Sequence, residues 1–334
     1  MALADFERID DFGDAAAEAK ACRSNCALFD FSFLECARLE GIGAKGAIEA
    51  FTGRSLAALD VGEIYYALRV EPAGNVVADL TVWRTGVISY EVMSGRHDDV
   101  TDLLDRAGPG VAVTDITADI ATFALQGPSS LDALRPIGDT AAIEPLGYFR
   151  FGRAQLNGIS CRIGRLGYTG EAGFEIILPR ACARELWQTL AAHAMPAGFI
   201  AADMLRIEAG YVLFSNEFRL FVSPQEAGIG RFHRSADLRA PRIALISFCA
   251  DAAALPLPWA PIRGLKRPGS PGEIVVTSAC ESIVAGGILG LGYIDADTKI
   301  GASFYDPSGT FRNIRRTPLP FYDPTKRRPR QPWR

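Results

Sequence analysis

The stretch Arg165-Leu166-Gly167-Tyr168-Thr169-Gly170-Glu171-Ala172-Gly173-Phe174-Glu175-Ile176 interleaves three glycines with aromatic and acidic side chains. Glycines at this density let a backbone turn sharply or approach a ligand closely. The flanking runs, 159–163 and 174–178, are apolar and typical of short strands. The pattern therefore predicts a strand, a glycine turn and a second strand, with Tyr168 and Glu171 at the bend. An ordinary hairpin with a solvated glutamate explains the same pattern.

Length and composition predict a folded chain of two or three domains. The 334 residues are 49% hydrophobic and 22% charged, which is enough for a sizeable core. The net charge of −4 argues against a protein that binds polyanions over its whole surface. Basic residues and prolines gather in the tail, residues 323–334, which we interpret as a solvated, disordered end rather than a contact for membrane or nucleic acid.

The cysteines and histidines predict neither disulfides nor a metal site. Seven cysteines are an odd number and are spread along the chain, and Cys22 and Cys26 have no second pair to complete a metal site. The three histidines are scattered singly. The acidic N-terminus does not resemble a signal peptide, and no run approaches the ~20 apolar residues of a membrane span. These features predict a cytoplasmic protein.

The order of periodic segments predicts an α+β fold. Up to residue 235 strands alternate with amphipathic helices, which suggests an α+β body of two lobes. From residue 236 prolines and glycines become frequent, helix signals vanish and short strands recur, as in a small all-β domain. The predicted domains are therefore 1–235, 236–322 and a basic, proline-rich tail, 323–334.

One glycine-rich motif suggests a different function. Gly41-Ile42-Gly43-Ala44-Lys45-Gly46 follows a strand-like run and precedes a helix-like one, as a dinucleotide-binding fingerprint does. No strand ending in an acidic residue follows about 20 positions later, and no βαβ repeat follows. We therefore favour a helix start over a nicotinamide site.

Two charged positions stand out from the residues alone. Asp79 interrupts an apolar strand, where an isolated buried carboxylate would be costly without a partner or a ligand. If it shares a face with Val77 and Thr81, that face meets either solvent or a cleft. Arg206, on a predicted helix, is either a surface residue or a guanidinium that orients a carboxylate or a polar heterocycle.

Several stretches together resemble one family, the glycine-cleavage T-protein (aminomethyltransferase) family of folate-dependent one-carbon transferases. The most specific is the opening stretch, which is similar to the family's Arg-x-Gly-Tyr-Thr-Gly-Glu-x-Gly-Phe-Glu signature. The other similar stretches follow in order: Leu28–Ser32, Gly74–Val82, Leu125–Pro128, Asp203–Gly210, Pro224–Gly230 and Thr277–Cys280. Together they span most of residues 15–322.

The resemblance implies a three-lobed aminomethyltransferase-like body with folate in a central channel and a C-terminal all-β, barrel-like domain. It implies tetrahydrofolate as the cofactor and Asp79 as the catalytic residue. It also implies that Glu171, Tyr168 and Arg206 belong to the folate site. Glu171 would accept N–H bonds from the pterin edge, and Tyr168 would pack on its flat ring.

The chain also departs from the family pattern. Met93-Ser94-Gly95 stands where the family often has Asn-Ser-Ala, so the thioether of Met93 replaces an expected polar folate contact. The segment 234–255 is compressed, and the stretch 31–34 is unusually aromatic. These differences suit a relative with another carbon donor.

The sequence therefore predicts an enzyme that moves a methyl or aminomethyl group from a small N-, O- or S-linked donor to tetrahydrofolate. A demethylase of a small methylated compound and a glycine-cleavage aminomethyltransferase, with a lipoyl carrier protein as partner, both fit. The alternative is a non-catalytic folate-binding protein or an accessory subunit of a demethylating complex. Neither a nucleic acid nor a membrane is an expected partner.

Overall fold

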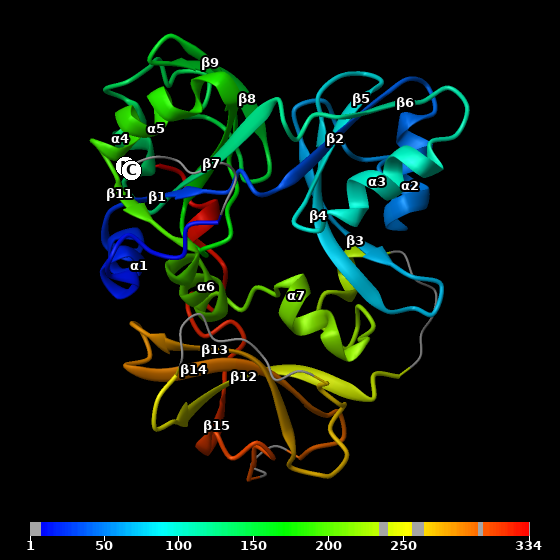
Figure 1. Ribbon diagram of the computed structural model, residues 1–334, viewed down its shortest axis with the longest axis vertical. Helices are drawn as coiled ribbons and strands as arrows, with labels where there is room; N and C mark the ends of the chain where they lie inside the picture. Colours follow the sequence, from blue (N-terminus) through cyan, green and yellow to red (C-terminus); the bar gives the residue numbers. More distant parts are fainter. Residues whose placement is uncertain (1–7, 234–239, 256–263, 300–302, 334) are drawn as a thin grey trace. The chain divides into compact units, whose positions relative to one another are not determined.

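The computed structural model describes residues 8–233, 240–255, 264–299 and 303–333. Its helices are α1 Ala15–Ser24, α2 Ala44–Thr52, α3 Asp98–Arg106, α4 Ser130–Leu134, α5 Ala183–Ala191, α6 Phe199–Glu208 and α7 Phe214–Glu217 (Figure 1). Four 3-10 helices are η1 Arg180–Cys182, η2 Phe218–Leu220, η3 Gly230–Phe232 and η4 Arg328–Arg330.

The strands of the first two-thirds of the chain are β1 Ala27–Asp30, β2 Glu35–Glu40, β3 Ile64–Val70, β4 Val76–Arg84, β5 Ser89–Ser94, β6 Ala112–Asp115, β7 Ile120–Gln126, β8 Phe151–Leu156, β9 Ile159–Gly164, β10 Gly173–Pro179 and β11 Met195–Ala197. The later strands are β12 Ile243–Asp251, β13 Ile274–Ser282, β14 Gly287–Asp295 and β15 Arg312–Thr317. Helices and strands thus mix as the α+β prediction requires.

The chain divides into two compact units. The first comprises residues 1–67, 80–202 and 326–334, and the second comprises residues 68–79 and 203–325. The domain boundary predicted between residues 235 and 236 lies outside the described residues, as does part of the segment predicted to be compressed. The predicted tail splits in the structure, because residues 326–333 belong to the first unit.

A six-stranded sheet in the order β11-β1-β7-β10-β9-β8 forms one half of the first unit. Its hydrophobic face, which includes Phe123, Phe174 and Ile176, packs against Leu186 and Trp187 of α5. β9 and β10 pair antiparallel, with Glu175 opposite Gly164. The predicted hairpin around the opening stretch is therefore confirmed.

A five-stranded antiparallel sheet, β3-β4-β5-β2-β6, forms the other half, with α2 and α3 on one side (Figure 1). Ile48 of α2 and Leu103 of α3 are buried in the same core cluster as Leu80 and Val82 of β4. The two sheets meet through a buried ion pair, in which the Arg162 guanidinium contacts the Glu91 carboxylate.

The motif Gly41–Gly46 begins a helix, α2. The interpretation that we favoured over a nicotinamide site is therefore confirmed. Gly43 is the N-cap of α2, and β2, the strand before it, pairs antiparallel with both of its neighbours. A Cβ atom at Gly41 would lie 2.1 Å from the Gly110 carbonyl oxygen, and Gly41 has a φ of +121°. Close packing against the backbone of residues 109–110 explains Gly41 and Gly43 without a bound phosphate.

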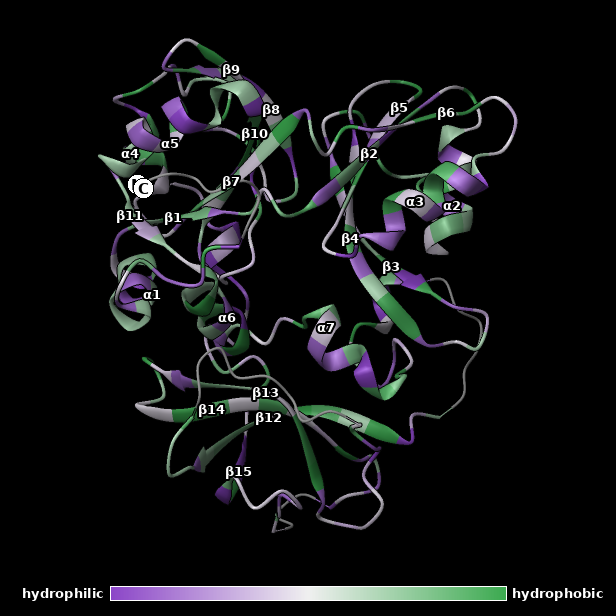
Figure 2. Ribbon diagram, in the orientation of Figure 1, coloured by the Kyte–Doolittle hydropathy of each residue, from purple (hydrophilic) through white to green (hydrophobic). Residues whose placement is uncertain are grey.

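The C-terminal β domain is confirmed, and its described strands form an open sheet rather than a closed barrel. The order is β13-β14-β12-β15, all antiparallel, with β13 and β15 at the edges. β12, which is mostly hydrophobic and largely green in Figure 2, supplies Ile246 and Phe248 to its core.

The tail is ordered where the structure describes it, so the expectation of a solvated, disordered end is wrong for residues 326–333. Trp333 stacks on Phe174 with ring centroids 4.9 Å apart, and Arg330 lies over the Tyr148 ring. Packing of the large Trp333 ring offsets the conformational entropy lost when the chain end is ordered. The prediction of a disordered tail considered only its basic residues and prolines.

Candidate functional site

The turn between β9 and β10 is built around Gln126 of β7. The Gln126 amide donates to the carbonyl oxygens of Leu166 (3.0 Å) and Phe174 (3.2 Å), and its oxygen accepts from the Thr169 hydroxyl at 3.1 Å. A Cβ atom at Gly167 would lie 1.8 Å from the Gln126 oxygen. The glycine is therefore required by this buried amide.

The other two glycines of the turn, Gly170 and Gly173, are also required by its structure. A Cβ atom at Gly173 would lie 2.7 Å from the Gln126 amide carbon, so this glycine also makes room for the same side chain. Gly170 has a φ of +79°, which side-chain-bearing residues rarely adopt. The glycines that mark the stretch are thus explained by the fold of the turn.

Glu171 lies in this turn and is only 3% exposed. Its Oε1 accepts from Nη1 of Arg23 in α1 at 3.1 Å, and its Oε2 accepts from Nη1 of Arg328 in η4 at 3.2 Å. Arg23 also donates to the Thr169 carbonyl oxygen at 2.8 Å. Glu171 is therefore a buried carboxylate in an ion-pair network, and the solvated glutamate of the simpler interpretation is excluded.

A carboxylate has about four acceptor positions, so the two arginines do not exclude an N–H donor from a ligand. Tyr168 lies in the same turn and is half-buried. Beside the network, burial raises the pKa of the Cys22 thiol to about 12, so this cysteine is a neutral thiol. The turn therefore joins one buried carboxylate to one half-buried aromatic ring.

Met93 lies in β5 and is 3% exposed. It belongs to a hydrophobic cluster that includes Cys36, Trp83 and Leu166. Packing in this cluster accounts for a thioether at the position, because methionine fills irregular apolar space well. Its predicted folate contact stays a prediction.

Asp79 lies in β4, in the second unit. Burial alternates along this strand: Ala78 and Leu80 are buried, whereas Val77, Asp79 and Thr81 are half-buried. The predicted common face of these three residues is confirmed. Asp79 thus stands on the more open face of a strand whose other face lies in the core.

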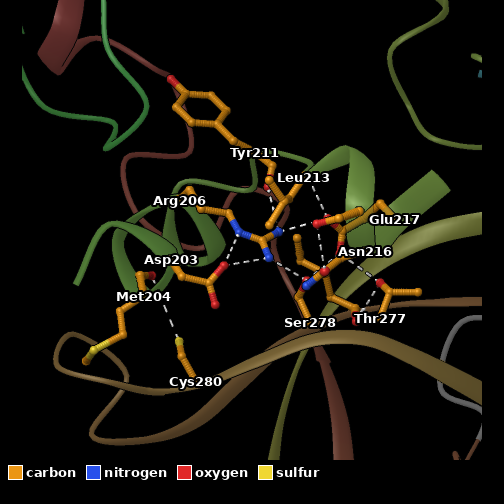
Figure 3. A network of polar contacts seen from close by, with 12 residues as sticks. Asp203, Met204, Arg206, Tyr211, Leu213, Asn216, Glu217, Thr277, Ser278 and Cys280 are labelled. Carbon is orange, nitrogen blue, oxygen red and sulfur yellow. Dashed lines mark hydrogen bonds and ion pairs between the residues drawn. The ribbon is translucent and has the colours of Figure 1, made fainter. Parts of the chain in front are cut away.

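Arg206 of α6, in the second unit, is fully buried, so the helix-surface interpretation is wrong. Its Nε donates to Oδ1 of Asp203 at 2.8 Å, and its Nη1 donates to Oε2 of Glu217 at 2.8 Å (Figure 3). Its Nη2 donates to the Ser278 hydroxyl at 2.6 Å. Each guanidinium nitrogen has a protein partner, so Arg206 orients carboxylates of its own chain.

Glu217 is the centre of this network and was not predicted from the sequence. Besides Arg206, its carboxylate accepts from the Thr277 hydroxyl at 2.9 Å and the Leu213 N–H at 2.7 Å (Figure 3). It is fully buried and joins the end of α6 to β13. Its only signal in the sequence was a charged residue within an apolar run.

Two further residues of the Glu171 network, Arg23 and Arg328, were also missed. Arg23 falls in an alanine-rich helix and Arg328 in the basic tail, and neither belongs to a stretch that resembles the family.

Over the parts of the chain that the structure describes, no group of three or more His, Cys, Asp or Glu side chains could hold a metal ion. Among the same residues, no helix is long and apolar enough to cross a bilayer.

Comparisons with known proteins agree with the sequence resemblance. The family model of the GCVT N-terminal domain matches residues 2–236. The chain is 32% identical to an aminomethyltransferase of Rubrobacter xylanophilus, over 92% of this chain and 86% of that protein. It is 31% identical to an aminomethyltransferase of Cutibacterium acnes, over 92% and 90% of the two chains.

A solved structure has the same fold. Glycine cleavage system aminomethyltransferase T from Bartonella henselae superposes with a TM-score of 0.79 at 22% identity, over 96% of this chain and 91% of that one. The resemblance found in the sequence is thereby confirmed in sequence and in fold. The chain belongs to the aminomethyltransferase family that carries the GCVT domain.

Proposed function

We propose that this protein is a tetrahydrofolate-dependent one-carbon transferase, which moves a methyl or aminomethyl group from a small donor to tetrahydrofolate. The observation that carries the proposal is the extent of the family match, because 92% of the chain aligns with an aminomethyltransferase. A match of this extent covers both compact units, including the strand that holds Asp79 and the turn that holds Glu171.

The residues fit such a ligand by their chemistry. The pterin ring of tetrahydrofolate has an edge of N–H donors, and Glu171 is a buried carboxylate fixed by two arginines. An ionised carboxylate is a strong hydrogen-bond acceptor, and the two arginines orient it. Tyr168, in the same turn, offers a flat ring for stacking.

Arg206 supports the site indirectly in this proposal. Its guanidinium holds Asp203, which is 7% exposed, and the fully buried Glu217. It therefore fixes the end of α6 and the segment that follows. The side chain of Met93 lies in the core, where it packs beside the folate site in this proposal.

Asp79 is the catalytic residue in the proposal. Tetrahydrofolate supplies the nitrogen that receives the carbon. A half-buried carboxylate can orient such a nitrogen, accept its proton and stabilise positive charge on the donor.

The test of Asp79 is the variant Asp79→Asn. We expect turnover to fall by at least about 100-fold, the usual contribution of a positioned acid or base. Tetrahydrofolate binding, measured by calorimetry, should change much less. The control is Asp297→Asn, which alters an exposed carboxylate in the same unit. Turnover at the wild-type rate would remove Asp79 from its role.

The carbon donor is either the aminomethylated lipoyl arm of a carrier protein or a methylated small molecule with an N-, O- or S-linked methyl group. We favour a small donor, because the stretch 31–34 is aromatic. Purified protein would be assayed with both classes under identical conditions. Turnover with the carrier protein and none with the small molecules would identify the carrier protein as the partner. We expect the enzyme to work in the cytoplasm.

A second candidate function is a folate-binding protein or accessory subunit without catalysis. It is favoured by the ion pairs that already involve Glu171 and Arg206, since such networks also serve stability. Calorimetry with tetrahydrofolate separates the two functions. Binding without turnover supports the second, and absence of binding contradicts both.

A further inference from the structure

The tail segment 326–333 contacts the turn between β9 and β10 along the whole length of that turn. It reaches Arg165, where the turn begins, Glu171, and Phe174, just after the turn ends. All of these residues belong to the first compact unit. A segment that is distant in the sequence therefore supports the turn as a whole rather than a single side chain.

Trp333 makes two of these contacts. Its ring stacks on the Phe174 ring, with centroids 4.9 Å apart and planes 23° apart, and the Arg165 guanidinium carbon lies 4.8 Å from the Trp333 ring centroid. The indole Nε1 is buried and has no hydrogen-bond partner among the residues that the structure describes. Ring contacts, and not a hydrogen bond, therefore hold this side chain against β10.

Arg165 connects the tail to the start of the turn. This residue is 4% exposed, its Nη1 donates to the Leu146 carbonyl oxygen at 2.8 Å, and its Nη2 donates to the Gln331 carbonyl oxygen. A buried guanidinium needs acceptors, because its desolvation is otherwise uncompensated. Without the tail, the residue that begins the turn would lose one acceptor and its contact with the Trp333 ring.

Arg328 holds the carboxylate of the turn. Its Nη1 lies 3.2 Å from Oε2 of Glu171, and its side chain is 46% exposed, whereas that of Glu171 is 1% exposed. The other carboxylate oxygen is bound by Arg23 of α1 at 3.1 Å. The orientation of Glu171 is therefore set from two elements, α1 and η4, of which one belongs to the tail.

We propose that the tail segment 326–333 is a positioning element of the ligand site, in which Trp333 and Arg328 hold the turn so that Glu171 and Tyr168 meet the ligand. The inference rests on the proposed function and adds to it. Trp333 and Arg328 are positioning residues, because they act through the turn and are not proposed to touch tetrahydrofolate.

The expected effect follows from the population of the conformations of the turn. A turn that has lost its support spends time in conformations in which Glu171 and Tyr168 are displaced. The apparent dissociation constant of tetrahydrofolate is the intrinsic constant divided by the fraction of protein in the competent conformation. Loss of the tail contacts should therefore weaken tetrahydrofolate binding, whereas Asp79→Asn should mainly slow turnover.

The first experiment is calorimetry with tetrahydrofolate on full-length variants. Trp333→Ala should raise the dissociation constant at least about tenfold, as for a turn that is competent about a tenth of the time. Arg328→Gln should raise it about threefold, because Arg23 still holds the other oxygen of the carboxylate. Arg327→Gln is the control in the same tail, where the side chain is exposed, and it should leave the dissociation constant unchanged.

The conservative variant Trp333→Phe separates positioning from general packing. It keeps a ring for Phe174 and gives up no hydrogen bond within the described parts of the chain, because the indole Nε1 has no partner there. Most of the affinity that Trp333→Ala loses should therefore be retained by Trp333→Phe.

The second experiment supplies the tail as a separate peptide. A chain truncated after Thr325 is titrated with tetrahydrofolate at a temperature at which circular dichroism shows it to be folded. Its affinity should be weak, and a saturating synthetic peptide of residues 326–334 should restore it, whereas a peptide of the same composition in scrambled order should not. If the truncated chain does not fold, the full-length variants decide.

The third experiment requires no ligand. Amide hydrogen exchange of residues 166–172 should be faster in Trp333→Ala than in the wild type, and exchange in β12 of the second unit should be the same in both. This comparison tests the support of the turn by the tail independently of tetrahydrofolate.

The outcomes separate this inference from the proposed function. Unchanged exchange of the turn in Trp333→Ala would overturn the inference. So would a folded Trp333→Ala protein that is less stable but binds tetrahydrofolate as tightly as the wild type, because the tail would then support the fold alone. Failure of the wild-type protein to bind tetrahydrofolate would instead contradict the proposed function.

Discussion

Glu171 and Arg328 are 157 positions apart in the sequence, yet their side chains form an ion pair with Nη1 and Oε2 at 3.2 Å. The pair joins the glycine turn to the tail of the chain. Since Arg23 contacts the other carboxylate oxygen at 3.1 Å, the buried Glu171 is held from both sides. The tail is therefore part of the candidate site's structure.

The contribution of this pair can be measured with Arg328→Gln. Arg328 is 46% exposed in its side chain, whereas Glu171 is 1% exposed. An exposed arginine usually contributes little, but its loss leaves a buried carboxylate with one partner fewer. We expect the free energy of unfolding in urea to fall by about 1 kcal/mol, with a smaller effect at 1 M salt.

Arg327→Gln is the matched control, because Arg327 is the exposed neighbour of Arg328 in the same tail. It should leave the free energy of unfolding unchanged within about 0.5 kcal/mol. Equal effects of the two variants would mean that the ion pair adds nothing to stability.

Substitution of Gly167 by alanine should be strongly destabilising. The new Cβ atom would lie 1.8 Å from the Gln126 oxygen, inside a turn that this amide holds with three hydrogen bonds. Displacement of a buried amide from its partners costs about 1–3 kcal/mol, and overpacking adds a similar amount. We expect a loss of about 3 kcal/mol in the free energy of unfolding.

Gly46→Ala is the same substitution in a helix where nothing lies within 4 Å of the new atom. It should stabilise the protein by about 0.5–1 kcal/mol, because alanine is the better helix former. A mild effect of Gly167→Ala, similar in size to that of Gly46→Ala, would contradict the described packing of Gln126.

The local pattern of apolar residues and turn residues predicted many of the helices and strands, but not which segments would contact one another. The strands β3 and β4 are readable from the sequence, because a turn with Gly74 separates two apolar alternating runs. The pattern missed β15, Arg312–Thr317, whose arginines do not look like a strand. Such an edge strand is charged because its outer side stays exposed.

The candidate site shows the same limit. The turn at Glu171 was predictable, because its glycines and carboxylate are adjacent in the sequence. Its partners Arg23 and Arg328 were not, since they come from distant segments and only the folded chain brings them together. In the same way, nothing in the sequence around Arg206 indicated that its guanidinium would pair with Glu217.

The network of Arg206 predicts a large loss of stability on Arg206→Met. The substitution removes the charge but keeps an apolar stem, and it leaves the fully buried Glu217 and the nearly buried Asp203 without their guanidinium. Breaking a buried pair in this way costs about 3–5 kcal/mol. Urea denaturation would measure the loss.

The double variant Arg206→Met with Glu217→Gln is the informative companion. It removes the stranded charge as well, so it should regain part of the stability that the single variant loses. If Arg206→Met changed only tetrahydrofolate affinity and not stability, Arg206 would be a ligand contact rather than a support for the second unit.

Glu175 predicts a dependence of stability on pH. It is 8% exposed, and its carboxylate has no hydrogen-bond or ion-pair partner in the described part of the chain. Burial alone raises the pKa of Glu175 from 4.5 to about 7. The folded state thus binds this proton more tightly than the unfolded state does.

The sign follows from this difference. Below pH 4.5 both states are protonated and the carboxyl group costs nothing, but between pH 4.5 and 7 only the unfolded state ionises, so the free energy of unfolding falls as pH rises. The fall from this one group is up to about 3 kcal/mol and is complete above pH 7. Glu175→Gln should therefore be about as stable as the wild type at pH 4.5 and clearly more stable at pH 8.

The measurement is urea denaturation of wild type and variant at both pH values, with Glu281→Gln, an exposed glutamate, as the control. The difference between Glu175→Gln and wild type should grow with pH, whereas the control should show no such trend. A constant difference across this range would mean that Glu175 is ionised in the folded protein, with a charge partner that compensates for its burial.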